Sequence, residues 1–154
     1  MNKYLKLAIS LIVPFLAASI GSIFTAQSSW YVELAKPAFQ PPNWIFGPVW
    51  TLLYLLMGIS LFLVWQKGFE SMRSKIALFF FSIQLFFNAL WSVLFFGLNK
   101  VMFAFVDIIA LWAAIALTMV SFYRISKTSM YLLIPYFLWV TFAMILNFSL
   151  FVLN

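Results

Sequence analysis

Several polar side chains that could do chemistry lie inside apolar stretches of this sequence. Asp107 is the one Asp, Glu, Lys or Arg between residues 101 and 123. A carboxylate at such a position can serve a functional site, form a hydrogen bond that fixes helix packing, or do both. Gln84, Asn88 and Trp91 follow one another at intervals of four and three residues, so a helix would place them on one face. Their polar groups could contact a ligand or link neighbouring helices by hydrogen bonds.

The last apolar stretch carries a second set of side chains with helical spacing: Tyr136, Trp139, Ala143 and Asn147. A large aromatic ring, a small side chain one turn further on and an amide beyond it could line a slot for a ligand. The same pattern is typical of a helix that packs in a protein core. An earlier stretch repeats the aromatic spacing, with Tyr54 four residues after Trp50.

The seven tryptophans fall into two groups by their depth in the apolar stretches. Trp30, Trp44 and Trp65 lie near the ends, where indoles typically anchor a protein at the membrane–water interface. Four others lie too deep for that role: Trp50, Trp91, Trp112 and Trp139. Together with the amides and Asp107, the deep rings predict a pocket roughly 10 Å below the membrane surface for a flat, mostly apolar ligand.

The residue types that are missing narrow the chemistry further. The sequence contains no Cys and no His, which excludes disulfides, zinc sites, Ser-His-Asp triads and His-ligated haem. No metal site is therefore predicted, and only Met or Tyr could ligate iron. The sequence also has no glycine-rich phosphate loop, so ATP-driven transport is not expected of this chain.

The composition indicates which elements must position these residues. Hydrophobic residues make up 66% of the 154 residues and charged residues 8%, which is typical of an integral membrane protein. Because a membrane helix needs roughly 20 mostly apolar residues, we predict an all-α bundle of five transmembrane helices in a single domain, residues 1–154. The first apolar run is longer than the core of a signal peptide, so it counts as a helix. The predicted helices span about residues 5–26, 44–65, 76–97, 101–122 and 129–152.

The distribution of basic residues predicts the orientation. Seven of the nine Lys and Arg residues lie at the amino terminus or after the second and fourth helices. We therefore expect a cytoplasmic amino terminus, with residues 30–43 outside. The net charge of +6 indicates membrane topology and attraction to anionic lipid, not nucleic-acid binding. The short amino terminus, with no mitochondrial-type presequence, is compatible with a bacterial plasma membrane.

The segment between the first two predicted helices is unusually rich in proline and aromatic residues. Residues 30–43 contain Pro37, Pro41 and Pro42, which restrict the backbone and reduce the entropy lost when a loop closes over a ligand. We predict that this long loop is a lid over the pocket. Pro48 is compatible with the first turn of the next helix.

Several motifs together carry a resemblance to a known family. In order, they are Trp30-Tyr31, Lys36-Pro37, Pro41-Pro42, Trp44, Phe46-Gly47-Pro48-Val49-Trp50-Thr51, Tyr54, Met57-Gly58, Gln84-Leu85, Asn88, Trp91-Ser92, Asp107, Pro135-Tyr136, Trp139, Phe142-Ala143 and Leu146-Asn147. Across nearly its whole length the sequence resembles the TspO/MBR family, the tryptophan-rich sensory proteins related to the mitochondrial translocator protein, or peripheral benzodiazepine receptor.

The resemblance implies a five-helix bundle, usually a homodimer, that binds protoporphyrin IX or haem as ligand or substrate and requires no cofactor. Animal members also bind cholesterol and synthetic benzodiazepine-type ligands. In bacterial relatives, light-dependent porphyrin breakdown would assign possible catalytic roles to Trp50 and Trp139. The family's ligand contacts correspond to Tyr31, Pro41, Trp50, Tyr54, Trp91, Asp107, Trp139 and Ala143, to which the helical spacing adds Asn88 and Asn147.

These observations favour a membrane tetrapyrrole-binding protein that acts in porphyrin homeostasis as a sensor, a buffer or a light-dependent degrader. One alternative is a transporter of small aromatic or amphipathic compounds that uses Asp107. Another is a lipid- or sterol-binding scaffold that signals through a protein partner. No basic residue follows Tyr136, although the animal cholesterol motif requires one, so high-affinity sterol binding is not predicted.

Overall fold

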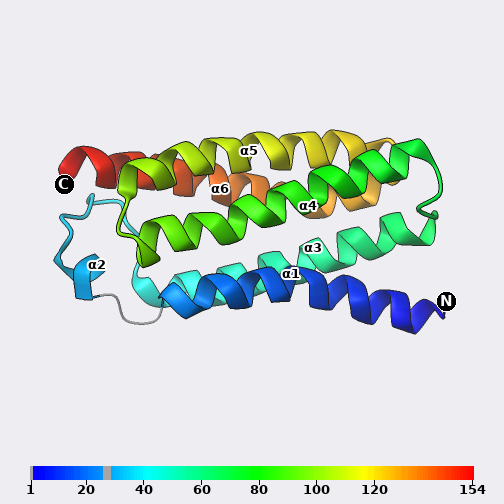
Figure 1. The fold of residues 1–154 in the computed structure, drawn as a ribbon, viewed down its shortest axis with the longest axis horizontal. Coiled ribbons are helices and arrows are strands. Elements are labelled where there is room, and N and C mark those ends of the chain that lie inside the picture. Colours follow the sequence, from blue (N-terminus) through cyan, green and yellow to red (C-terminus); the bar gives the residue numbers. More distant parts are fainter. Residues whose placement is uncertain (1, 26–28) are drawn as a thin grey trace.

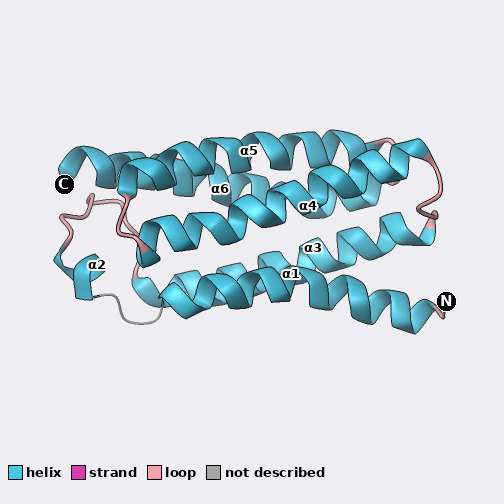
Figure 2. Ribbon diagram, in the orientation of Figure 1, coloured by secondary structure: helices cyan, strands magenta, loops and turns pink. Residues whose placement is uncertain are grey.

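The computed structural model describes residues 2–25 and 29–154, which fold almost entirely into helices (Figure 2). The elements are α1 (Lys3–Thr25), α2 (Ser29–Glu33), a 3₁₀ turn (Asn43–Ile45), α3 (Phe46–Gln66), α4 (Met72–Ser92), a π-helical turn (Val93–Gly97), α5 (Val101–Tyr123) and α6 (Lys127–Leu153). In the described part of the chain, five helices are long and apolar enough to cross a membrane: α1, α3, α4, α5 and α6. The predicted all-α, five-helix fold is confirmed.

Two helices begin earlier than predicted. α4 begins at Met72 rather than near residue 76, because Ser71 caps it and its Oγ accepts a hydrogen bond from the backbone N–H of Ser74 at 3.1 Å. α6 begins at Lys127 in the same way, after a serine cap. The predicted starts followed the charge-free runs, but the first turn of a membrane helix can carry charges at the lipid surface.

The five long helices form a ring in which each packs against two others. The order around the ring is α1, α3, α6, α5 and α4, with α4 again against α1. The amino terminus lies at one end of the bundle, and α2 and the carboxyl terminus lie at the other (Figure 1). The α3–α4 and α5–α6 turns share the end that carries the amino terminus.

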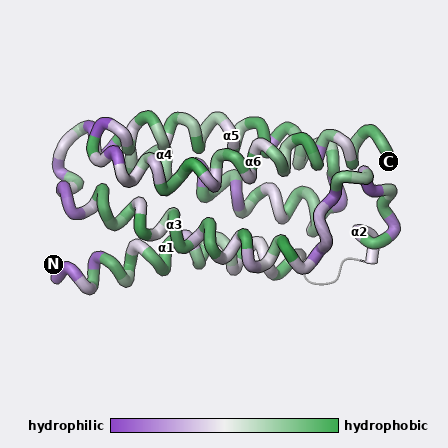
Figure 3. Tube along the Cα trace, turned by 180° about the vertical axis from the view of Figure 1, so that it is seen from behind, coloured by the Kyte–Doolittle hydropathy of each residue, from purple (hydrophilic) through white to green (hydrophobic). Residues whose placement is uncertain are grey.

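Apolar side chains fill the ring and also cover its outside. Tyr54, Met57, Phe81, Ile115 and Tyr136 belong to one buried cluster in which every member is at most 8% exposed. Large hydrophobic residues are exposed on the outer faces of the helices, and hydrophilic residues gather toward the two ends (Figure 3). Such a distribution suits a bundle surrounded by lipid, where the backbone polar groups are satisfied within the helices.

Small residues allow α1 to approach its neighbours closely. A Cβ atom at Gly58 of α3 would lie 2.8 Å from the Cα of Leu11 and 2.9 Å from the carbonyl oxygen of Ser10. At Gly21 of α1, a Cβ would lie 3.0 Å from Oγ of Ser92 in α4. Close backbone approach at small residues is a usual way for membrane helices to pack.

The segment between α1 and α3 contains more helix than predicted. The expected loop at residues 30–43 overlaps α2 and the start of the 3₁₀ turn. Lys36 Nζ donates hydrogen bonds to the carbonyl oxygens of Tyr31 at 2.9 Å and Val32 at 3.0 Å. These carbonyls belong to the last turn of α2, where a cation is favourable. A helix of five residues gives no periodic pattern in the sequence, which explains why it was not predicted.

This segment is also joined to the carboxyl terminus. The Asn154 side chain accepts a hydrogen bond from the backbone N–H of Ala35 at 2.9 Å and donates one to the Ala35 carbonyl oxygen at 3.0 Å. The segment therefore lies against the end of the bundle where α6 finishes. That it opens and closes as a lid stays a prediction.

Candidate functional site

A hydrogen-bonded cluster of polar side chains links three helices in the interior. The Tyr54 hydroxyl donates to Oδ1 of Asn88, and Asn88 Nδ2 donates to the Tyr136 hydroxyl at 2.9 Å. That hydroxyl donates in turn to Oε1 of Gln84 at 2.7 Å. All four side chains are buried. Because α3, α4 and α6 each contribute to it, this interior cluster fixes their relative positions.

Trp50 extends the interior cluster with an aromatic face. Its ring stacks on Tyr54, with centroids 5.5 Å apart and planes inclined by 29°. Its edge meets Tyr136 at 6.2 Å and 69°. Trp50 precedes Tyr54 by four residues, about one helical turn, so it contacts two members of the interior cluster. Trp50, Tyr54 and Asn88, all predicted ligand contacts, thus lie near one another although they come from two helices. That they bind a ligand stays a prediction.

Trp139 lies on α6, beside a group of phenylalanines. Its ring meets Phe46 edge-on at 5.8 Å and lies 5.5 Å from Phe142. Its Nε1 is buried and has no hydrogen-bond partner in the part of the chain that the structure describes. The other deep indoles on α4 and α5 do have partners, since Nε1 of Trp91 donates to a side-chain oxygen at 2.8 Å and Nε1 of Trp112 does so at 2.9 Å. A buried N–H without a partner is uncommon in proteins, and an acceptor atom placed beside it would satisfy it.

Asp107 on α5 is the second group of this kind. Its side chain is 6% exposed, and neither carboxylate oxygen has a hydrogen-bond partner among residues 2–25 and 29–154. Nε2 of Gln84 is also buried without one. Burying a carboxylate without a hydrogen bond lowers the stability of the fold. Such residues inside membranes are therefore rare, and those that occur often have a functional role. The sequence allowed two roles for Asp107, a functional carboxylate and a hydrogen bond that fixes helix packing. The structure shows no such hydrogen bond among the described residues.

Trp91 and Asn147 are joined by a hydrogen bond between their side chains. Trp91 Nε1 donates to Asn147 Oδ1 at 2.8 Å, and Asn147 Nδ2 donates to the backbone carbonyl of Val101 at 3.1 Å. These bonds connect α4, α6 and α5. The indole of Trp91 also stacks on Phe95, with centroids 4.9 Å apart and planes inclined by 16°. The sequence allowed either a ligand contact or an interhelical hydrogen bond for Trp91, and the structure shows the hydrogen bond.

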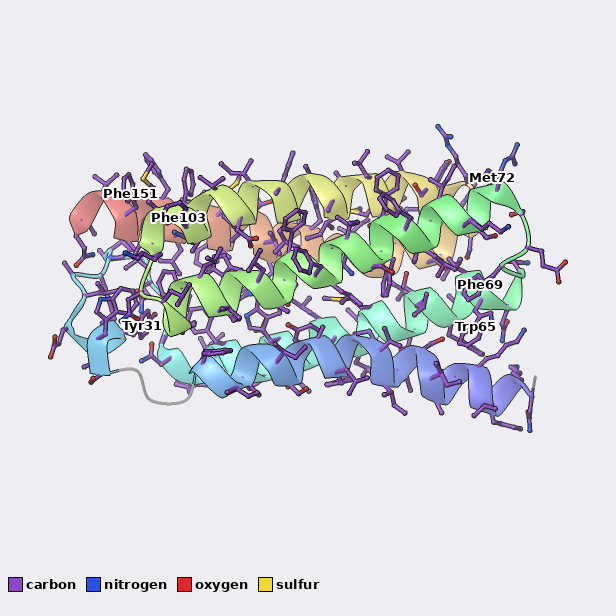
Figure 4. All side chains as sticks on the ribbon, in the orientation of Figure 1. Tyr31, Trp65, Phe69, Met72, Phe103 and Phe151 are labelled. Atoms are coloured by element: carbon purple, nitrogen blue, oxygen red, sulfur yellow. The ribbon has the colours of Figure 1, made fainter. Side chains whose placement is uncertain are left out.

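Tyr31 lies on α2, at the end of the bundle (Figure 4). Its ring packs edge-on against Phe95 at 6.1 Å and Phe96 at 5.4 Å, and its hydroxyl accepts a hydrogen bond from Gln40 Nε2 at 2.9 Å. Burial raises the pKa of the Tyr31 hydroxyl, and the bond to Gln40 opposes this shift. Tyr31 is thus held over the π-helical turn, away from the interior cluster.

Two predicted ligand contacts remain, Pro41 and Ala143. Pro41 is half-buried in the segment before α3, and Ala143 is half-buried on α6. Phe39 of the segment meets Phe142, the neighbour of Ala143, edge-on at 6.3 Å. The segment before α3 therefore reaches the same part of α6 as Trp139.

Two aromatic contributors were not assigned to the site from the sequence. Phe46 contacts Trp139, and Phe95 contacts Trp91. A spacing rule could have found both, because Phe46 precedes Trp50 by four residues and Phe95 follows Trp91 by four. Residues four apart lie on the same face of a helix.

A surface hollow at this end of the bundle is separate from the predicted site. It has a volume of about 530 Å³ and lies between α2, the start of α5 and the end of α6. Phe103 and Phe151, both labelled in Figure 4, are among its lining residues. None of the predicted ligand-binding residues lines it.

The fold and the site define a polytopic α-helical membrane protein with an aromatic interior that contains few polar groups. A model of the TspO/MBR family matches residues 10–153, and the chain belongs to that family. It is 49% identical over 152 residues to the tryptophan-rich protein TspO of Archaeoglobus fulgidus, covering 97% of each chain. Identity to the protein of the same name from Chlorobaculum tepidum is 42%, over 100% of this chain and 99% of the relative. The human translocator protein is 36% identical over 89% of this chain and 83% of its own.

Proposed function

We propose that this protein binds a tetrapyrrole such as protoporphyrin IX within the bundle and acts in porphyrin homeostasis as a sensor, a buffer or a light-dependent degrader. The observation that carries the proposal is the pairing of aromatic rings with unpartnered polar groups. Trp50, Tyr54 and Trp139 supply ring faces and edges. Asp107 and the Trp139 N–H supply an acceptor and a donor that have no partner among the described residues.

The chemistry of a porphyrin suits these groups. Its macrocycle is a wide aromatic plate, so indole and phenol rings gain stacking energy on it. Its pyrrole N–H groups are donors for a carboxylate such as Asp107, and its propionates are acceptors for an indole N–H such as that of Trp139. Because the sequence has no His or Cys, recognition would depend on the macrocycle rather than on an iron ligand.

The same placement suits a photo-oxidative reaction. An illuminated porphyrin generates oxidants, and an electron-rich indole next to it could intercept or relay them. Trp50 and Trp139 are the indoles we propose for this role. The stacked Trp50–Tyr54 pair would extend any relay toward the interior cluster.

Binding would also involve the segment before α3. Phe39 packs against Phe142 beside Trp139, and Gln40 bonds to Tyr31. We propose that this segment moves as a lid when a ligand enters. Haem, synthetic benzodiazepine-type compounds and membrane lipid are further proposed ligands, and a homodimer in a bacterial plasma membrane with a cytoplasmic amino terminus is the proposed assembly and orientation.

A transporter of small aromatic or amphipathic compounds is the second candidate function. It is favoured by one observation, the buried carboxylate of Asp107 without a partner, because intramembrane carboxylates often couple transport to protons. Uptake into sealed proteoliposomes that follows a pH gradient and disappears in Asp107→Asn would support it. Uptake unchanged by the gradient and by that substitution would contradict it.

A porphyrin titration tests the leading proposal. Purified protein should bind protoporphyrin IX at a saturable site, and Trp50→Phe combined with Trp139→Phe should weaken binding by about tenfold through loss of indole stacking and the N–H donor. Absorbance and fluorescence would follow binding in the dark and porphyrin loss under illumination. The double variant should also slow that loss.

A matched control removes the same number of indoles elsewhere. Trp44→Phe with Trp65→Phe should leave the affinity unchanged, because Trp44 is 74% exposed and Trp65 stacks on Phe69 at the other end of α3. Equal affinities in the two double variants would contradict the pocket. Weaker binding with an unchanged rate of photochemical loss per bound porphyrin would contradict only the reactive role of the indoles.

A further inference from the structure

A second hollow lies at the opposite end of the bundle, beside the amino terminus. Its volume is about 500 Å³. The α3–α4 turn, the first turn of α4 and the α5–α6 turn form its walls. Its lining residues are Lys67, Ser71, Met72, Arg73, Ser74, Arg124 and Ile125. This basic hollow shares no residue with the proposed porphyrin site.

Three of the lining side chains are cations that the protein does not neutralise. Lys67, Arg73 and Arg124 come from different elements, and among the described residues none of them makes an ion pair or a side-chain hydrogen bond. Glu70, the acidic residue of the α3–α4 turn, does not line the hollow. Three like charges around one concavity repel one another unless an anion lies between them.

The backbone adds further donors on the same side. α4 has 21 residues and begins at Met72, and residues 71–74 line the hollow, so the positive end of the helix dipole lies at its wall. The hydroxyls of Ser71 and Ser74 lie 2.9 Å apart, and Ser74 is only 3% exposed. Guanidinium groups, hydroxyls and a helix amino terminus together are the donors that tetrahedral phosphate prefers.

The apolar surroundings of the hollow point to a lipid as the source of that phosphate. Met72 lines it and is 70% exposed, and Ile125 lines it as well. Trp65 and Phe69 stack at 5.1 Å and 17° in the same part of the bundle, where Figure 4 shows them with Met72. An indole at the end of a membrane helix typically marks the headgroup level. A phosphate held there would have its acyl chains next to exposed apolar side chains.

We infer that the basic hollow binds the phosphate of an anionic phospholipid. Arg73 and Arg124 contact the phosphate oxygens from two sides, Lys67 adds a third charge, and Ser71 donates a hydrogen bond. The lipid thereby connects the α3–α4 turn to the α5–α6 turn, which are far apart in sequence. The site is independent of porphyrin binding.

Native mass spectrometry of the purified chain would test this inference with phosphatidylglycerol and phosphatidylcholine as probes. The wild-type protein should retain phosphatidylglycerol preferentially. Arg73→Gln with Arg124→Gln should lower that preference by about tenfold, because two charges at the lipid phosphate are lost. Lys75→Gln with Lys127→Gln removes the same net charge at the same end but outside the hollow, and should change the preference less than twofold.

The outcomes separate the possible sources of the phosphate. Equal loss in the two double variants would overturn the site, because lipid retention would then follow overall charge. Arginine-dependent binding of inorganic phosphate, without any preference for phosphatidylglycerol, would overturn the lipid as the ligand. Thermal unfolding of each variant checks the fold, and if the arginine pair does not fold, Lys67→Gln alone should lower the lipid preference about threefold.

Discussion

Two groups of buried polar side chains differ in whether their polar atoms have hydrogen-bond partners in the protein. Tyr54, Asn88 and Tyr136 form hydrogen bonds across three helices. Among the described residues, the carboxylate of Asp107 and the indole N–H of Trp139 are buried and form none. In the interior cluster, Nε2 of Gln84 is the atom that also lacks a partner. The first group accounts for helix packing, and the second has no structural role that its contacts explain. The comparison predicts that the groups without a hydrogen-bond partner, rather than buried polar groups in general, are the ones available to a ligand.

Removing the centre of the satisfied group should have the largest effect on stability. Asn88→Leu leaves the hydroxyls of Tyr54 and Tyr136 with fewer partners, and we expect the free energy of unfolding to fall by about 2 kcal/mol. Denaturation in detergent would measure this. Ser82→Leu, at an exposed position of the same helix, should leave stability within about 0.5 kcal/mol of wild type. If Asn88→Leu were no more destabilising than this control, the structural role of the cluster would be wrong.

Replacing the unpartnered carboxylate of Asp107 should lower ligand affinity without lowering stability. Asp107→Leu removes a buried polar group that has no hydrogen bond, so the unfolding midpoint should stay the same or rise. Protoporphyrin IX affinity should fall by about tenfold, or about 1.4 kcal/mol, because an acceptor for the ligand is lost. Parallel denaturation and titration would measure both quantities. A destabilised variant with unchanged affinity would place Asp107 with the satisfied group.

A smaller effect is expected where only the unpartnered donor is removed. Trp139→Phe keeps an aromatic ring next to Phe46 and Phe142 but lacks the N–H. Stability should change by less than about 0.5 kcal/mol, and porphyrin affinity should fall about threefold. Trp112→Phe is the matched change, because its N–H already donates to Thr141 and should matter for packing instead of binding. Reversed effects of these two substitutions would refute the distinction between the groups.

The sequence predicted correctly which of the candidate residues share a face of one helix. The spacing of Trp50 and Tyr54 placed them on one face of α3, and they stack there. The spacing of Gln84 and Asn88 likewise placed both amides in one cluster. These predictions succeeded because the geometry within a helix depends only on sequence separation. The start of α4 and the helix α2 were not predicted, since a serine cap and a lysine side chain define them rather than hydrophobic periodicity.

By itself, the sequence determined that this is a membrane protein of five apolar helices and which residues share a face of each helix. The length of a charge-free segment and its helical repeat can be read from neighbouring residues alone. The hydrophobic effect then drives each such apolar segment out of water. Only the tertiary structure decided which polar groups meet. Asn88 and Asn147 find partners on other helices, whereas Asp107 and the Trp139 N–H do not. That outcome depends on the order of the helices around the ring, which no local pattern in the chain encodes.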